Sequence, residues 1–314
     1  MLSLNATGPA VNALQATLAH LGYLTGFETF GRFGPLTQGA VKWFQHNNGL
    51  ATDGVVGPLT EAALATAKPI KVSLGADFRS PPADVAAFAQ ALAEKGITFV
   101  LRYANRNDPT KNLTKPEVDA YTAAHIYTGL VWENGYPISP EERIAKGLPA
   151  NYFTPATGIE DGQGAAEFAQ TLGFPNWAPI RFAADYSPPA SDFPMLDDYF
   201  SAVAQGVGGD YPIWGYGSGA LGAYLLAHNP HVTGWWLAGS PGWSGYDDFL
   251  LGQRWNLKQG PNGILLAGVQ VDIDVSLGNG GGWLPGVSQA PGNPEAEALE
   301  KRIQAAVKIL TEGE

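Results

Sequence analysis

Carboxylate side chains stand where four hydrophobic segments of this sequence end. The positions are Asp77 in 72–78, Glu133 after 126–132, Asp185 after 180–184, and Asp272 with Asp274 after 265–271. An acid at the end of a buried strand loses part of its hydration, which raises its pKa toward the range that a general acid needs. Glycosidic cleavage uses one such carboxyl to protonate the leaving oxygen and a second as base, nucleophile or charge stabiliser. These residue types in this pattern therefore indicate a carboxylate site.

Aromatic side chains are expected near the same strand ends, where they could hold a sugar ring by its face. They are Tyr103, Tyr216, Trp236 and Trp255. Each acid alone also has a simpler explanation, because an Asp that closes a strand often caps the next helix or forms a turn. Asp185, which precedes Ser187-Pro188-Pro189, is one such case. Four acids at comparable positions favour a site over four unrelated turns.

The elements that must position these acids alternate between strand and helix. Strands are predicted at 72–78, 98–103, 126–132, 180–184, 213–216 and 234–238, with 254–257 and 265–271 as the last two. Repeated βα units imply a parallel sheet, and about eight of them over residues 72–285 predict a (β/α)8 barrel of the TIM type. An open doubly wound sheet is the alternative, but no Gly-x-Gly-x-x-Gly follows the first strand. In a barrel, the carboxyl ends of the strands share one face.

A short repeat marks the first part of the chain. Gly34-Pro35-Leu36-Thr37 and Gly57-Pro58-Leu59-Thr60 each follow a turn and each predict a helix start, since Pro is favoured at the first helical position. With an amphipathic segment around Val11–Leu21, they predict a small all-α three-helix bundle over residues 1–68. Residues 68–71 are predicted to be a linker.

The order of residues in this first part resembles the peptidoglycan-binding domain 1 family. The matching positions include Leu14-Gln15, Leu21-Gly22-Tyr23, Phe33-Gly34, Phe44-Gln45, Asp53-Gly54 and Val56-Gly57. One departure is Phe30-Gly31, where the family pattern has an Asp-Gly turn. The resemblance implies peptidoglycan binding beside the Asp-Gly turn, with Thr37, Gln45, Asp53 and Gly54 as candidate contacts. A bundle with some other partner is the alternative.

Residues 70–284 resemble the glycoside-hydrolase-like barrel that is distantly related to family 25 lysozymes. The landmarks are Gly75-Ala76-Asp77-Phe78, Leu101-Arg102-Tyr103, Val131-Trp132-Glu133, Gly162-Gln163-Gly164, Ala184-Asp185-Tyr186 and Trp235-Trp236. The resemblance implies a muramidase-like activity, with Glu133 as general acid, Asp185 as first carboxylate of an Asp-x-Glu motif, and Asp77 and Asp272 as supporting acids. Arg102 joins the four aromatic residues as a candidate substrate contact. The second acid of the motif is Ser187 here, so either Glu133 has taken its role or the barrel binds glycan without cutting it.

Composition excludes several other classes of function. The net charge of −11 disfavours nucleic acid and anionic membranes as partners. No cysteine and only 5 histidines are present, which disfavours a zinc site, a thiol nucleophile and the usual zinc amidases. No cofactor and no metal are therefore expected. Neither a transmembrane segment nor a signal peptide is evident, so synthesis in a host cytoplasm and release through a holin are expected.

The tail from Pro294 predicts a helix over residues 294–312. Leu299, Ile303, Ala306 and Leu310 share one face, which either docks on the barrel or joins two copies in a homo-oligomer. Together these features predict an endolysin-type peptidoglycan hydrolase of a phage. The alternatives are a non-catalytic wall-binding or phage structural protein with a degenerate barrel, and an enzyme that cuts amide or ester bonds. Muramidase and glucosaminidase activity both remain open.

Overall fold

The structure of the chain is a computed structural model. This structure describes residues 1–24, 31–69, 72–80, 82–134, 144–145, 151–252, 255–260, 262–278 and 280–285. The predicted helix at 294–312, the homo-oligomer contact based on it, and Phe30 lie outside the described residues. The predicted boundaries of the parts, 1–68 and 72–285, stay predictions.

The N-terminal region, residues 1–64, is helical. Its helices are α1 (Pro9–His20), α2 (Pro35–Asn47) and α3 (Pro58–Leu64). Each helix begins with a proline that follows a glycine, because the missing N–H of proline has no helical partner at that position anyway. The helix starts predicted at Pro35 and Pro58 are confirmed.

Two buried glutamines explain why the Gly-Pro-Leu-Thr repeat exists. Gln45 donates to the carbonyl of Val55 (3.0 Å) and to Thr60 Oγ1 (3.1 Å), and its Oε1 accepts from the N–H of Gly54 (2.9 Å). Gln15 makes the same three bonds with Arg32 O (3.0 Å), Thr37 Oγ1 (2.9 Å) and Gly31 N–H (2.8 Å). Each glutamine thus ties a glycine turn to the first turn of the next helix.

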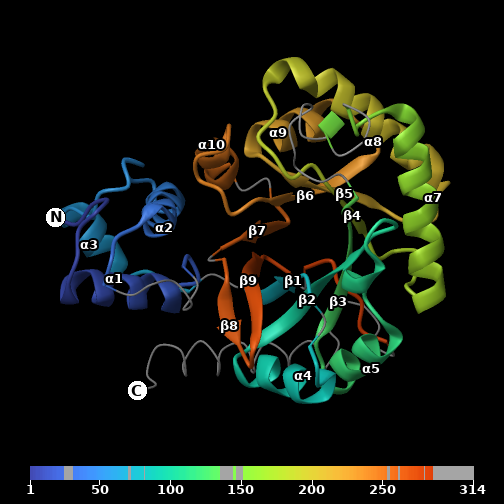
Figure 1. Cartoon of the computed structure of the whole chain (residues 1–314). Helices are drawn as coiled ribbons and strands as arrows, with labels where there is room; N and C mark the ends of the chain where they lie inside the picture. The colour runs from blue at the N-terminus through green and yellow to red at the C-terminus, as the bar shows by residue number, and fades with distance from the viewer. Residues whose placement is uncertain are drawn as a thin grey trace.

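Strands β1 to β7 and β9 form a closed barrel of eight strands surrounded by helices (Figure 1). The strands are β1 (Ser73–Phe78), β2 (Ile97–Ala104), β3 (Tyr127–Trp132), β4 (Ile180–Ala183), β5 (Ile213–Gly217), β6 (Val232–Leu237), β7 (Leu257–Gln259), β8 (Ile264–Leu266) and β9 (Val269–Ser276). Neighbours from β1 to β7 are parallel. The closed barrel confirms the coarse prediction.

The last strand corrects the prediction of eight parallel βα units. β9 closes the barrel antiparallel to both β1 and β7. The segment 265–271, predicted as one strand, is instead the tip of a β8–β9 hairpin. Ala267 and Gly268 form its two-residue turn, and both have positive φ, 45° and 83°. Such a turn reverses the chain within the sheet and removes the need for a crossover helix.

The helices that cover the barrel follow the strands in order. They are α4 (Val85–Glu94), α5 (Lys115–Ala123), α7 (Pro155–Leu172), α8 (Phe193–Val207), α9 (Gly219–His228) and α10 (Tyr246–Leu251), with the 3-10 turns η1 (Pro109–Lys111) and η2 (Ala190–Asp192). Capping side chains set several starts: Thr114 and Glu117 form a capping box on α5. Gly162 of α7 lies against the backbone of α8, where an added Cβ would stand 2.3 Å from Val203 O. This close approach requires glycine.

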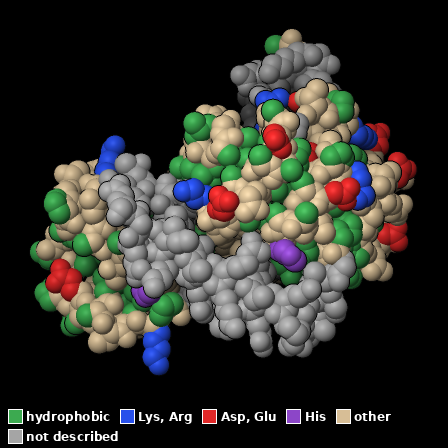
Figure 2. Space-filling view, turned by 90° about the horizontal axis from the view of Figure 1, so that it is seen from below, with side chains coloured by type: hydrophobic (Ala, Val, Ile, Leu, Met, Phe, Trp, Pro, Cys, Tyr) green, Lys and Arg blue, Asp and Glu red, His purple; other side chains and the backbone are tan. Residues whose placement is uncertain are grey.

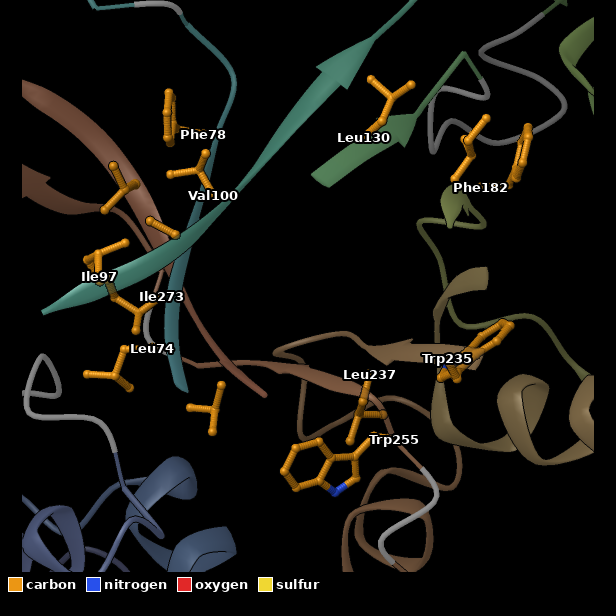
Figure 3. Close-up of a cluster of buried hydrophobic side chains, with 14 of the residues drawn as sticks. Leu74, Phe78, Ile97, Val100, Leu130, Phe182, Trp235, Leu237, Trp255 and Ile273 are labelled. Carbon is orange, nitrogen blue, oxygen red and sulfur yellow. The ribbon is translucent and has the colours of Figure 1, made fainter. Parts of the chain in front are cut away.

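Successive side chains of each strand point to opposite sides of the barrel wall, so the hydrophobic side chains form two layers. The inner layer fills the barrel with Phe99, Leu101, Tyr127, Val131, Trp236 and Leu257. The outer layer lies between strands and helices and includes Val100, Leu130, Phe182, Trp235 and Ile273 (Figure 3). Consecutive residues of β2 therefore belong to different layers.

The outer layer continues without interruption into the N-terminal region. Trp43 of α2 meets the ring of Trp255 edge to face at 5.2 Å, and both are buried. Lys42 forms an ion pair with Asp247 of α10. The helices α2 and α10 lie side by side (Figure 1). The two parts are thus packed together and share one hydrophobic core.

On the face of the molecule seen in Figure 2, acidic and basic side chains are scattered among hydrophobic and polar ones.

Candidate active site

A polar pocket opens at the carboxyl ends of the parallel strands. Its volume is about 230 Å³. The acid pocket is lined by Tyr103, Val131, Glu133, Ala183, Asp185, Tyr216, Trp236, Ser240, Gln259, Asn262 and Asp272. The structure thus brings together six of the nine residues that the sequence placed in the barrel site.

Asp77 lies beneath the lining and is bonded to it. Its Oδ1 accepts from the hydroxyl of Tyr103 (2.6 Å), and its Oδ2 accepts from Nε2 of Gln259 (2.8 Å). Burial raises the pKa of Asp77 from 3.8 to about 7, and the charges of Asp272 and Glu133 add to this rise. The two hydrogen bonds oppose it. A buried carboxyl next to other acids therefore holds a proton close to neutral pH.

Asp272 reaches the pocket because β9 runs against the other strands. It lies in the middle of β9, and its Cα pairs in register with that of Asp77. Its Oδ1 accepts from the N–H of Gly263 (2.7 Å), and its Oδ2 accepts from Gln259 (3.3 Å). Burial raises its pKa, and the Gly263 hydrogen bond lowers it. The sequence placed Asp272 at the end of a strand, which is wrong, although it does line the pocket.

Asp185 stands two residues beyond the end of β4, at the wall of the pocket. Burial, followed by the charge of Glu133, raises its pKa from 3.8 to about 6. A hydrogen-bonding interaction with Tyr216 and the charge of Lys111 lower it. Because the net shift is upward, Asp185 exchanges a proton within the range where a general acid works.

Glu133, directly after β3, has a cationic partner. Its Oε2 lies 3.0 Å from Nζ of Lys111, and only 19% of its side chain is exposed. The same ammonium lies over the ring of Tyr103, 5.4 Å from the ring centre. The Asn105 side chain donates to the carbonyl of Glu133, which fixes the backbone there. Lys111 thus compensates a negative charge at Glu133.

A further carboxyl lies below the pocket, inside the barrel. Asp274 accepts from the indole N–H of Trp236 at 2.9 Å, and its Oδ2 has no hydrogen-bond partner among the described residues. Burial, then the charge of Asp77, raises its pKa well above 3.8, while Arg181 lowers it. Burial lowers the pKa of Arg181 to about 9. The interior of the barrel is therefore ionisable rather than purely hydrophobic.

Two predicted substrate contacts lie away from the pocket, which corrects the sequence-based site. Arg102 is fully buried on the outer face of β2, where its Nε donates to Glu117 Oε1 at 2.7 Å. Because Tyr103 faces the pocket, its neighbour Arg102 must face the helices. Trp255 lies in the outer layer near Leu237 (Figure 3). Its ring also packs against Trp43. Its indole N–H donates to Leu250 O at 3.1 Å.

Ser187, at the position where the lysozyme motif has its second acid, bonds to a neighbouring loop. Its Oγ donates to Ser244 Oγ (3.2 Å) and accepts from the N–H of Ser244 (3.0 Å). Ser187 is not part of the pocket lining. This position contributes a loop contact and no carboxyl.

The candidate contacts of the N-terminal region divide into buried and exposed residues. Thr37 and Gln45 are buried within the glutamine networks, so neither offers a free polar group at the surface. Gly54 is also buried and has φ of 70°. Asp53 is exposed, and hydrogen bonds from the Val55 N–H and from Gln45 lower its pKa. Of the four, Asp53 is the one whose side chain can meet a ligand.

Sequence reasoning missed Gln259 and Lys111. Gln259 was not distinguished because neutral amides have no strong pattern of their own, and β7 is only 3 residues long. Lys111 lies in η1, in the loop between β2 and α5, and so does not follow a strand directly in the sequence. The run Lys111-Asn112-Leu113-Thr114 precedes a well-capped helix, which was the one available signal.

No group of three or more His, Asp or Glu residues suited to a metal ion occurs in the part of the chain that the structure describes. Among the same residues, no helix combines the length and hydropathy needed to span a membrane.

Comparison with protein families identifies both parts of the chain. Residues 90–260, more than half of the chain, match the family described as Rv2525c-like, glycoside hydrolase-like domain. The chain belongs to this family. Residues 7–64 match the family described as putative peptidoglycan binding domain. Both recognitions made from the sequence are confirmed at the level of family.

The individual relatives either have low sequence identity to this chain or match it over a short segment. The Tat-secreted protein Rv2525c of Mycobacterium tuberculosis, solved with L-tartrate, is 14% identical with a TM-score of 0.52, covering 64% of this chain and 94% of that chain. A family 25 glycosyl hydrolase of Bacillus anthracis is 14% identical with a TM-score of 0.40, covering 66% and 89%. An uncharacterized protein of Kitasatospora aureofaciens is 48% identical over 64 residues, 20% of this chain. The chain spans about half, 54%, of that curated relative.

Proposed function

We propose that this protein cleaves glycosidic bonds in the glycan strands of peptidoglycan. The observation that supports this most strongly is the pairing of two unlike carboxyls in one pocket. Asp185 has a pKa raised to about 6, whereas Glu133 has an ammonium partner at 3.0 Å. Glycosidases need one carboxyl that carries a proton and one that carries a charge.

The electrostatics of the pocket favour a particular division of roles. Asp185 donates its proton to the leaving oxygen. Glu133, with its charge compensated by Lys111, acts as base, nucleophile or stabiliser of the positively charged sugar. The resemblance to family 25 lysozymes implies the proton-donor role for Glu133, and that assignment is the competing one. Asp77 and Asp272 are further carboxyls beneath the sugar, and Tyr103, Tyr216 and Trp236 provide ring faces.

Peptidoglycan is the proposed substrate because of the N-terminal region. Its match to a putative peptidoglycan binding domain supports wall binding. The face of α2 that packs on α10 is occupied by the barrel, so wall binding must use other surfaces, among them the exposed turn at Asp53. The finer prediction, a phage endolysin that reaches the wall through a holin, stays part of this proposal. Its test is lysis of cells that co-express a holin.

Digestion of purified peptidoglycan tests the activity. Wild type should release new reducing ends, and Asp185→Asn should release at least about 100-fold fewer, the usual contribution of a general acid. Glu133→Gln should also lose activity. A substrate whose leaving group has a low pKa needs no general acid, so it should partly restore the activity of Asp185→Asn but not that of Glu133→Gln. The opposite pattern would return the proton-donor role to Glu133. Free amines without reducing ends would contradict a glycosidase.

A second candidate function is binding without cleavage. Ser187 favours it, since this position supplies no carboxyl and its hydroxyl is bonded to Ser244. In that case wild-type protein would sediment with purified wall and release neither reducing ends nor amines at any pH.

A further inference from the structure

Gln259 lines the acid pocket and makes four hydrogen bonds there. Its Nε2 donates to Asp77 Oδ2 (2.8 Å) and Asp272 Oδ2 (3.3 Å). Its Oε1 accepts from the hydroxyl of Tyr216 (3.1 Å) and the N–H of Gly239 (3.2 Å). The residue is 5% exposed. A carboxamide has two donor hydrogens and one acceptor oxygen with two lone pairs, so these four contacts use its full capacity.

The barrel determines which way this side chain points. Leu257 belongs to the inner layer and Lys258 contacts the N-terminal region, so the alternation of β7 sends Gln259 back inside. Its Cα pairs in register with that of Asp274 on β9. Asp272, two residues earlier on β9, faces the same way. From β7 the amide therefore reaches Asp272 on the neighbouring strand β9 and Asp77 on β1, the strand on the other side of β9.

The outer face of β7 is braced by the N-terminal region. The ammonium of Lys258 lies 5.7 Å from the centre of the Trp43 ring. The space between α2, α10 and β7 leaves a void of only about 10 Å³, too small to hold more than one water. A three-residue strand packed in this way has little freedom to move Gln259 away from the acids.

Tyr216 has one hydroxyl hydrogen and two acceptors for it. One acceptor is Gln259 Oε1, and the other is Asp185, whose pKa this hydroxyl lowers when it donates there. By accepting from Tyr216, Gln259 weakens that effect and so favours the protonated form of Asp185. By donating to Asp77 and Asp272, it favours their ionised forms. The two ends of one amide thus act in opposite senses on the two sides of the pocket.

We propose that Gln259 is a positioning residue of the acid pocket, which keeps Asp77 and Asp272 ready to ionise and Asp185 ready to hold a proton. The proposal deepens the glycosidase function proposed above and rests on it. The other ionisable groups around this amide are Tyr103 on β2, Lys111 and Glu133 at the wall, Arg181 on β4, Tyr216 on β5, Lys258 on β7 and Asp274 on β9. Each of these groups can gain or lose a proton, whereas the amide of Gln259 stays neutral at every pH and still both donates and accepts hydrogen bonds.

The test replaces the amide by an apolar chain of similar length. Gln259→Met removes the donors to Asp77 and Asp272 and the acceptor for Tyr216. The basic limb of the pH–rate profile, which reports the proton on Asp185, should move down by about one pH unit, the size expected for one hydrogen bond, because Tyr216 is then left with Asp185 as its acceptor. Gln259→Glu restores the acceptor for Tyr216 and adds a negative charge, so this limb should move up. Gln205→Met, at an exposed position of α8, is the matched control and should leave the profile unchanged.

Carbon-13 NMR titration of the Asp carboxyls gives a readout that does not need turnover. In Gln259→Met the titration midpoint of Asp77 should rise and that of Asp185 should fall. If wild type releases no reducing ends but these midpoints move as stated, the glycosidase is wrong and the role of Gln259 in the pocket holds. If activity is present but the basic limb and both midpoints stay within about 0.2 pH unit of wild type, Gln259 is a packing residue only. A basic limb that moves up in Gln259→Met would also overturn the proposal.

Discussion

The N-terminal region and the barrel both depend on a buried glutamine, but they use it differently. Gln45 bonds to a backbone carbonyl, a backbone N–H, a hydroxyl and the exposed Asp53, and so fixes a turn against a helix. Gln259 bonds to the buried carboxyl of Asp77, the half-buried carboxyl of Asp272 and the phenol of Tyr216. Both glutamines therefore contact acids, but the one acid of Gln45 is exposed at a turn, whereas those of Gln259 lie at the pocket with raised pKa values. The role of a buried polar side chain therefore has to be inferred from the groups to which it is bonded.

The largest expected effect is a loss of catalysis, a property of the barrel, without a loss of wall binding, the property proposed for the N-terminal region. Asp185→Asn removes the proposed proton donor, so release of reducing ends should fall by about 100-fold or more. Wall binding should be unchanged, because Asp185 lies in the barrel pocket. Assays of product release and of sedimentation with peptidoglycan measure the two properties separately. A parallel loss of both would mean that the variant is misfolded, which circular dichroism detects.

The next largest effect should be on stability. Gln45→Met leaves the N–H of Gly54 and the Oγ1 of Thr60 buried without their partner, at a cost of about 2–3 kcal/mol. Gln259→Met should also destabilise, but by an amount that falls as the pH drops through about 7, because a protonated Asp77 accepts a weaker hydrogen bond from this amide. Urea denaturation of the two variants at several pH values compares them directly. The same pH dependence in both variants would erase the distinction between the two glutamines.

Stability should also depend on pH through the buried acids of the barrel. The pKa of Asp77 in the folded protein, about 7, lies above its ordinary value of 3.8. Its contribution to stability is therefore complete below pH 3.8 and is lost as the pH rises to about 7. Asp185, with a folded-state pKa of about 6, acts in the same sense. The melting temperature should fall between pH 4 and pH 7, and Asp77→Asn should flatten this fall, as differential scanning calorimetry would show.

The smallest effect concerns the contact that joins the two regions. Lys258→Met keeps the aliphatic stem but removes the ammonium over Trp43, which should cost about 0.5–1 kcal/mol. Unfolding should remain a single transition, because the outer hydrophobic layer is continuous across both parts. Two separate transitions in wild type would show that the regions are independent.

The sequence could predict the acids that follow parallel strands, because parallel strands bring their carboxyl ends to one face. Asp77, Glu133 and Asp185 follow this rule. Asp272 joins them for a reason that was not visible, since Ala267-Gly268 is a weak signal for a hairpin turn compared with Asn-Gly. Arg102 could have been excluded, because strand alternation forbids it from sharing a face with Tyr103. Gln259 could not be found, because its role depends on partners that are 182 and 13 residues away.

The close packing of Trp43 on Trp255 has a geometric consequence for how the protein would work on a wall. An enzyme on a flexible tether can reach every bond within the length of its linker. Here α2 rests on α10, so the pocket stands at one fixed offset from whatever the N-terminal region grips. If the proposed cleavage occurs, the fragments cut from a regular glycan strand should therefore have preferred lengths that reflect this fixed distance.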